Sequence, residues 1–138
     1  MPYRDNVDSC FSRPSPELLK KREKNRILEY YTLRDRNSSM FKKVNIEQVK
    51  QQIFNGKPVV FAIHVDDKWE PKGFLENYQD TTEYIWKNFS SKAGNHAMLC
   101  IGYDDKKGAF KALNSFGEDW VNDGYIWIDY DILPRLVR

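Results

Sequence analysis

The sequence predicts an α+β domain in which an antiparallel, barrel-like sheet carries one or two packed helices. Two observations predict this class: a capped amphipathic pattern after Asn45, and a succession of alternating, strand-like segments separated by turn residues in the last third of the chain. At 138 residues the chain can bury one sizeable core but not two. We therefore expect an extended lead-in over residues 1–15 and one domain over residues 16–138.

The first third of the chain predicts a short helix followed by a strand. Ser15 before Pro16 is typical of a helix start, and the basic residues that follow predict a helix over about 16–25. Residues 26–33 alternate in polarity and end at a polar stretch, which predicts a strand. We interpret the basic cluster over residues 20–26 as a solvated helix face; contact with phosphates or an acidic partner is the other interpretation.

A second helix is predicted directly after Asn45, which is a suitable N-cap. Ile46, Val49 and Ile53 then recur at a spacing that places them on one helix face. Gly56 is well placed to end the helix, because glycine readily adopts the left-handed conformation common at helix ends.

The remaining segments predict a sheet. The mostly apolar run over 59–65 predicts a central, buried strand. Residues 66–91 are polar and aromatic without a clear period, which indicates a structured, functional loop with a possible short hairpin or helical turn. A turn-rich segment separates 96–103 from 109–114 and predicts a hairpin, and 124–130 alternates as a further strand.

Composition excludes several classes of function. The net charge of +2 argues against dedicated nucleic-acid binding, and no apolar run approaches the ~20 residues of a membrane helix. The polar first residues predict no signal peptide. The two cysteines, Cys10 and Cys100, form neither a disulfide framework nor a zinc-ligand spacing, and they indicate no compartment. His64 and His96 lack ligand partners at metal spacing, so we expect no metal or cofactor.

One pair of residues indicates chemistry. His96 opens one strand of the predicted hairpin, and Asn114 ends the other. The midpoint between them is residue 105, in the turn, so both side chains are expected at the same end of the hairpin. An asparagine oxygen there can accept from one imidazole N–H, which leaves the other ring nitrogen as a general base or as the partner of a thiolate.

The motifs around this pair resemble the C-terminal, right-hand barrel half of the papain-family cysteine peptidases. Taken together and in order they are specific, although each alone is weak. The matching segments are Gly56-Lys57-Pro58-Val59-Val60, His96-Ala97, Gly102-Tyr103, Asn114-Ser115-Phe116-Gly117, Trp120 and Gly124-Tyr125, with Pro2-Tyr3 followed by Cys10 similar to the family's Tyr-Pro-Tyr region.

The resemblance implies roles for four residues. His96 would be the catalytic imidazole and Asn114 the amide that orients it. Phe116 stands where the family has a tryptophan that shields the His–Asn hydrogen bond; a phenylalanine still excludes water but lacks the indole N–H. Trp120 would lie on the leaving-group side of the cleft.

The resemblance also implies a specificity pocket. Ala62 and Ala97 would help to line it, and their small side chains would admit a bulky apolar group of the substrate. Val121 replaces the glycine that usually follows the second tryptophan, which makes the loop before the last strand harder to predict.

The nucleophile expected for this chemistry is missing. The family's Gln…Cys-Gly-Ser-Cys-Trp region has no counterpart here, so the oxyanion-hole glutamine is missing too. Cys10 lies in a turn-like context with nothing to lower its pKa, and is a poor candidate. Cys100 lies four residues along the strand from His96, ~13 Å away, and is expected in the core. We interpret His64 as structural.

Three hypotheses follow. In the first, the chain supplies the His/Asn half of a peptidase acting on peptides or proteins, with Cys and Gln on a missing or separate helical chain. In the second, it is a non-catalytic binding or assembly module. The third, an unrelated hydrolase such as a bacteriocin-leader peptidase or a transglutaminase, requires Asp and is disfavoured by Asn114. We expect a partner or self-association to cover apolar groups near His96, Ala62 and Trp120.

Overall fold

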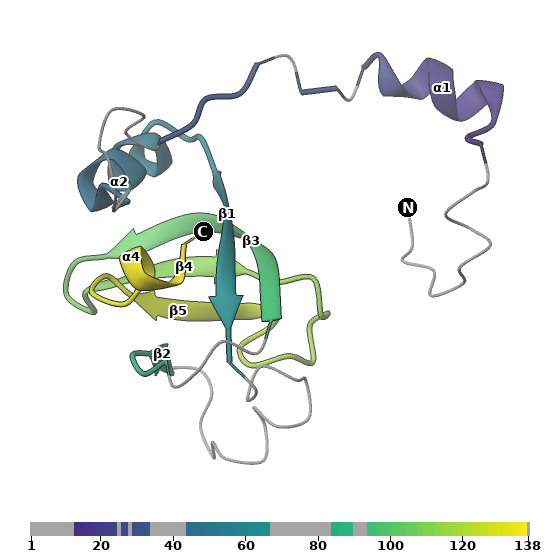
Figure 1. Cartoon of the computed structure of the whole chain (residues 1–138). Helices are drawn as coiled ribbons and strands as arrows, with labels where there is room; N and C mark the ends of the chain where they lie inside the picture. Colours follow the sequence, from purple (N-terminus) through teal and green to yellow (C-terminus); the bar gives the residue numbers. More distant parts are fainter. Residues whose placement is uncertain are drawn as a thin grey trace. The chain divides into compact units, whose positions relative to one another are not determined.

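The computed structural model describes residues 13–24, 26–27, 29–33, 44–66, 84–89 and 94–137 (Figure 1). The chain divides into two compact units, Met1–Thr32 and Leu33–Arg138, which are described separately. Most of the expected lead-in over residues 1–15 lies outside the described residues.

The first unit contains the predicted short helix but not the predicted strand. Helix α1 spans Pro16–Arg22, and the Ser15 side chain accepts a hydrogen bond from the Leu18 backbone amide, which confirms the cap. None of the described residues in 26–33 belongs to a strand, so that prediction is wrong for this part of the chain. Alternation alone does not make a strand, because a strand also needs a neighbour that hydrogen-bonds to its backbone.

The second unit opens with the other predicted helix. Helix α2 spans Ile46–Phe54 and begins where the Asn45 side-chain oxygen accepts from the Gln48 backbone amide at 3.2 Å. Val49 is buried against the sheet, and Gly56 follows the helix with a φ of 72°. The cap, the apolar face and the glycine stop are therefore confirmed.

Within the described residues, five strands form one sheet in the order β1-β3-β4-β5-β2. All neighbours are antiparallel except β2 and β5, which are parallel. The predicted hairpin of β3 and β4 and the last strand, β5, are confirmed. The bounds are β1 Val59–Val65, β2 Ile85–Trp86, β3 Gly94–Asp104, β4 Ala109–Leu113 and β5 Tyr125–Asp129.

Strand β1 lies at an edge of the sheet, which corrects the prediction of a central, buried strand. Its burial alternates: Phe61 and Ile63 are buried, whereas Val60 is 73% exposed. A run of apolar residues does not distinguish an edge strand with an apolar outer face from a strand that is buried on both faces.

The sheet is open within the described residues and does not close as the expected barrel. Its two edges, β1 and β2, do not pair with each other, and β2 has only two residues. Helix α4, Leu133–Leu136, lies beside β1 instead, and Val137 forms one antiparallel bridge to Ile63. Of the long loop predicted over 66–91, the structure describes Asp66 and residues 84–89.

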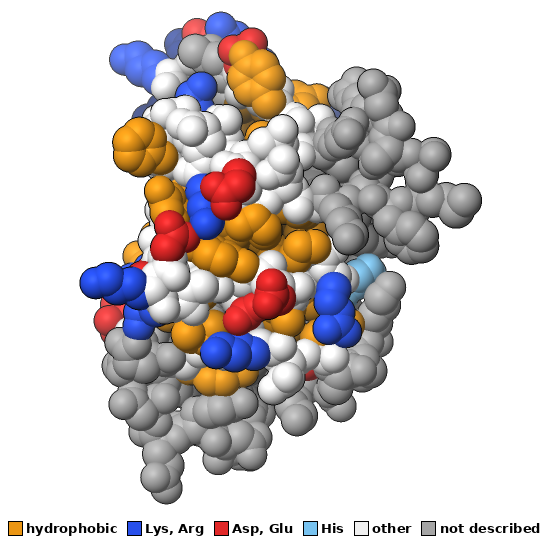
Figure 2. Space-filling model, turned by 90° about the vertical axis from the view of Figure 1, so that its left-hand side faces the viewer, with side chains coloured by type: hydrophobic (Ala, Val, Ile, Leu, Met, Phe, Trp, Pro, Cys, Tyr) orange, Lys and Arg blue, Asp and Glu red, His pale blue; other side chains and the backbone are white. Residues whose placement is uncertain are grey.

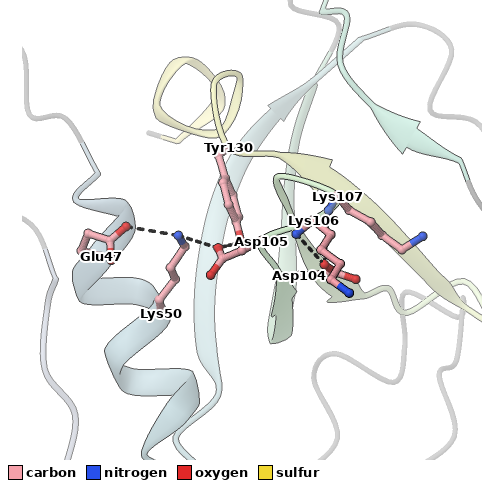
Figure 3. Close-up of polar contacts among 7 residues, drawn as sticks. All are labelled: Glu47, Lys50, Asp104, Asp105, Lys106, Lys107 and Tyr130. Carbon is pink, nitrogen blue, oxygen red and sulfur yellow. Dashed lines mark hydrogen bonds and ion pairs between the residues drawn. The ribbon is translucent and has the colours of Figure 1, made fainter.

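A cluster of ion pairs and hydrogen bonds joins α2 to the turn between β3 and β4 (Figure 3). The Lys50 ammonium lies 2.8 Å from the Asp105 carboxylate and 3.2 Å from Glu47, and it also lies over the Tyr130 ring at 4.5 Å. The Tyr130 hydroxyl donates to the same Asp105 oxygen at 3.0 Å. The bond from Lys50 lowers the pKa of Asp105, and burial raises the pKa of Tyr130.

The surface is mixed in character. Figure 2 shows a face on which basic, acidic and hydrophobic side chains are interspersed rather than gathered by sign. Within the described part of the chain, no helix has the length and apolar character needed to cross a membrane.

Candidate active site

His96 and Asn114 meet at the open end of the β3–β4 hairpin. The ring Nε2 of His96 lies 2.7 Å from Oδ1 of Asn114. The register explains this, because Leu99 is opposite Leu113 and both site residues lie just beyond that pair, away from the turn. The two side chains that the hairpin argument placed together are therefore in direct contact.

The hydrogen bonds of Asn114 identify which imidazole nitrogen carries the proton. The Ser115 backbone amide donates to Oδ1 of Asn114 at 2.7 Å. A backbone amide can only donate, so the Asn114 atom facing it is the oxygen, and that oxygen also faces His96. Nε2 of His96 must then be the donor. In the neutral ring, Nδ1 is the nitrogen without a proton and can act as a base.

The Asn114 side chain is buried. It is 8% exposed, and its Nδ2 has no hydrogen-bond partner among the described residues. Only the oxygen side of the amide therefore holds the imidazole. A hydrogen bond in such a low-dielectric site is electrostatically stronger than the same bond in water.

Two aromatic rings pack in succession beside the imidazole. Phe116 packs on His96 with ring centroids 5.1 Å apart and an interplanar angle of 34°, and Trp120 meets Phe116 edge to face at 5.7 Å. Phe116 is 42% exposed, whereas Trp120 is 2% exposed. Trp120 itself therefore lies in the core, beneath Phe116, and the apolar surface exposed beside Trp120 and His96 belongs to Phe116.

The loop over residues 115–124 has an unusual backbone. Gly117, Val121, Asp123 and Gly124 all have positive φ. A side chain on Gly124 would approach the Gly117 carbonyl oxygen at 3.0 Å, and with a φ of 82° any other residue there would be strained. For a residue with a side chain the left-handed conformation costs about 1–2 kcal/mol, and a β-branched residue such as Val121 is a particular outlier. From the sequence, this position stood out only because the resemblance to the family predicts a glycine where the chain has Val121.

A pocket lies beside one of the two alanines that were predicted to line a specificity pocket. A pocket of about 270 Å³ is lined by Ala97, but Ala62 is not part of its lining. Ala62 lies directly opposite Ala97 on β1, and both are exposed. Because side chains alternate along a strand, Ala97 projects from the opposite sheet face to His96. The complete lining is Val60, Ala97, Met98, Leu99, Leu113, Asn114 and Ser115.

The structure excludes one of the two cysteines as a nucleophile. Cys100 is 0% exposed on β3, and burial raises the pKa of its thiol to about 12. The prediction that it belongs to the core is confirmed. Cys10 lies outside the described residues. His64 is half-buried on β1, opposite Asn95. The described part of the chain contains no cluster of three or more metal-ligating side chains.

The family model for the papain family of cysteine proteases matches residues 2–133. This chain belongs to that family. It is 28% identical over 89 residues to an uncharacterized peptidase C1-like protein of Acanthamoeba polyphaga mimivirus, covering 62% of this chain and 26% of that protein. It is 46% identical over 48 residues to the P34 probable thiol protease of Glycine max, covering 33% of this chain and 13% of that protein.

A solved structure agrees on the fold. Xylellain, a cysteine protease from Xylella fastidiosa, superposes with a TM-score of 0.56 and 28% sequence identity, covering 68% of this chain and 34% of that one. The papain-family chain thus spans roughly a third or less of the length of these relatives. The α+β class and the papain-like strand arrangement are confirmed, with the open sheet described above.

Proposed function

We propose that this papain-family chain supplies the imidazole and its orienting amide for thiol-dependent hydrolysis of peptide bonds. The observation that carries the proposal is the 2.7 Å contact between His96 Nε2 and Asn114 Oδ1. Because the Ser115 amide fixes that oxygen, Nδ1 of His96 is the nitrogen able to take a proton from a thiol.

The reaction follows from that tautomer. A cysteine thiol transfers its proton to Nδ1 of His96, and the thiolate attacks the peptide carbonyl carbon. The imidazolium then protonates the leaving amine, which gives a thioester. Water, deprotonated by the neutral imidazole, hydrolyses the thioester and releases the carboxylic acid and the thiol. Asn114 keeps the ring oriented throughout.

The thiol in this proposal comes from a complementary helical chain or half-domain that also carries the oxyanion-donating glutamine. Cys100 is buried and protonated at neutral pH, so it cannot serve. An apolar row on the outer sheet face offers a docking surface: Val60 lies opposite Leu99, and Leu99 lies opposite Leu113. The pocket beside this row, which includes Ala97, suits an apolar side chain of a peptide or protein substrate.

A second candidate function is a non-catalytic binding or assembly module. The burial of Cys100 favours it, since this is the one thiol in the described residues and it cannot react. The same apolar row would then bind a partner without chemistry at His96.

A covalent labelling experiment separates the two functions. The tagged chain is isolated with its partners from its native source and treated with a thiol-directed epoxide, and the modified cysteine is mapped by mass spectrometry. We expect the label on a partner cysteine and peptide hydrolysis that is lost in a His96→Ala version. A folded complex that takes no label, with partner binding unaffected by His96→Ala, would establish the binding module instead. A label on Cys10 would place the nucleophile within this chain.

A further inference from the structure

The loop between β4 and β5 contains a valine in a backbone conformation that valine rarely adopts. Val121 has a φ of 52°, and Asp123, two residues later, has a φ of 50°. Aspartate tolerates this region far better than a β-branched residue does. Val121 is only 7% exposed, whereas Asp123 is exposed. The unfavourable backbone at Val121 therefore accompanies the burial of its side chain in the core.

Backbone hydrogen bonds of the residues on either side of Val121 hold the loop in its conformation. The Gly124 amide donates to the Trp120 carbonyl at 2.9 Å, and the Trp120 amide donates to the Gly117 carbonyl at 3.3 Å. The Asn114 amide donates to the Gly124 carbonyl at 2.9 Å, which joins the end of the loop to the site. Val121 lies within the turn that the bond between Gly124 and Trp120 closes, so a change of its backbone would act on that turn.

Trp120 in turn supports the ring that covers the imidazole. Its edge-to-face contact with Phe116 is 5.7 Å between centroids, and Phe116 lies 5.1 Å from the His96 ring. Phe116 is 42% exposed, so packing beneath it has to keep it over His96. Val121 and Trp120 are adjacent in the chain and belong to the same core, and two ring contacts then lead from Trp120 to the imidazole.

We infer that Val121 is a positioning residue for His96: its buried side chain anchors the 115–124 loop so that Trp120 holds Phe116 against the imidazole. The inference rests on the proposed role of His96, but its test requires no hydrolysis. It can therefore fail while the proposed function stands, and the reverse also holds. A purely structural Val121 would affect stability without affecting the surroundings of His96.

The test uses NMR of the full chain with three variants. Val121→Gly removes the anchor and suits a positive φ. Asp123→Gly is the matched control, since it makes the same backbone change at an exposed position. Val49→Ala is the second control, because Val49 is a buried valine, 3% exposed, in α2. The readouts are the cross-peaks between the Phe116 and His96 rings, the solvent exchange of the His96 Nε2 proton, and the melting temperature.

We expect Val121→Gly to lose the Phe116–His96 cross-peaks and to broaden the Nε2 proton signal by faster exchange. Asp123→Gly should keep both signals, and Val49→Ala should lower the melting temperature while keeping both. If the NMR spectrum of Val121→Gly lacks the chemical-shift dispersion of a folded protein, Val121→Ala is used in its place, and the same changes are expected. The inference is overturned if the folded Val121 variant keeps both signals, or if Val49→Ala removes them equally.

Discussion

At the scale of single residues, the site depends on which atoms hold the imidazole. Asn114 Oδ1 accepts from both His96 and the Ser115 amide, and the other side of its amide has no hydrogen-bond partner among the described residues. The asparagine therefore works through one oxygen. The sequence predicted this pair because the turn of a hairpin lies midway between them, a local relation that needs no tertiary information.

Replacing Asn114 should disturb the tautomer of His96 more than the fold. In Asn114→Ala the Ser115 amide and the His96 Nε2–H both lose their acceptor, so we expect a loss of about 1–3 kcal/mol in the free energy of unfolding. ¹⁵N NMR of the imidazole should show both neutral tautomers instead of one. Asn114→Asp keeps the acceptor oxygen and serves as the control. A single unchanged tautomer in Asn114→Ala would contradict the assignment.

Cys100 should make stability depend on alkaline pH. Burial raises the pKa of its thiol from 9.0 to about 12, so the buried neutral thiol favours the folded state at pH below 9. This contribution is lost as pH rises from 9 through 12, and roughly 4 kcal/mol is its upper bound. We expect Cys100→Ala to show a smaller fall in unfolding free energy between pH 8 and 11 than the wild type, measured by urea denaturation. Equal slopes would show that the thiol is accessible in the folded protein.

At the scale of elements, α1, α2 and the β3–β4 hairpin were predicted, α4 was not, and the environments of the strands were predicted less well. Local residues fix both ends of α2, because Asn45 caps its start and Gly56 follows its end, and both predictions were confirmed. The position of β1 in the sheet was predicted wrongly, because an apolar run does not reveal which strands will flank it. Residues 26–33 failed as a strand for a related reason: no described neighbour pairs with them.

The Lys50–Asp105 pair should couple α2 to the β3–β4 turn in a pH-dependent way. The lowered pKa of Asp105 means that the pair stabilises the fold above the usual carboxyl range and loses this effect as pH falls through the lowered value. A double-mutant cycle of Lys50→Gln and Asp105→Asn should show favourable coupling at pH 7 and none near pH 2, by thermal denaturation. Lys21→Gln, which breaks an exposed pair with Glu17 in α1, should leave the melting temperature unchanged. Coupling that persists in acid would rule out the ion pair as its source.

At the scale of the whole molecule, the chain forms an open sheet with an apolar row on its outer face. Val60, Leu99 and Leu113 are neighbours across three strands, and Val60 is 73% exposed. Ala97 contributes to the adjoining pocket, but Ala62 does not. Which alanine borders a pocket depends on how three strands come together, so the expectation for Ala62 rested on the resemblance alone.

The isolated chain should self-associate through this row unless a partner covers it. Val60→Lys should reduce the sedimentation-velocity dimer fraction and the binding of a hydrophobic dye, while the free energy of unfolding changes by no more than about 0.5 kcal/mol, as for most surface substitutions. Phe54→Lys is the matched control, because Phe54 is 76% exposed but lies on α2. A monomer at high concentration that binds no dye, or an equal effect of Phe54→Lys, would contradict the assignment of this surface.

The sequence by itself determined the α+β class, the caps of α1 and α2, the β3–β4 hairpin and the pairing of His96 with Asn114. These depend on hydrogen bonds and turns between residues close along the chain. Only the tertiary structure decided that the sheet stays open, that β1 is an edge strand and that Trp120 lies beneath Phe116. It also decided that Val121 adopts a left-handed backbone. Burial and strand order arise from contacts between distant segments, so they cannot be predicted from the spacing of residues along one segment.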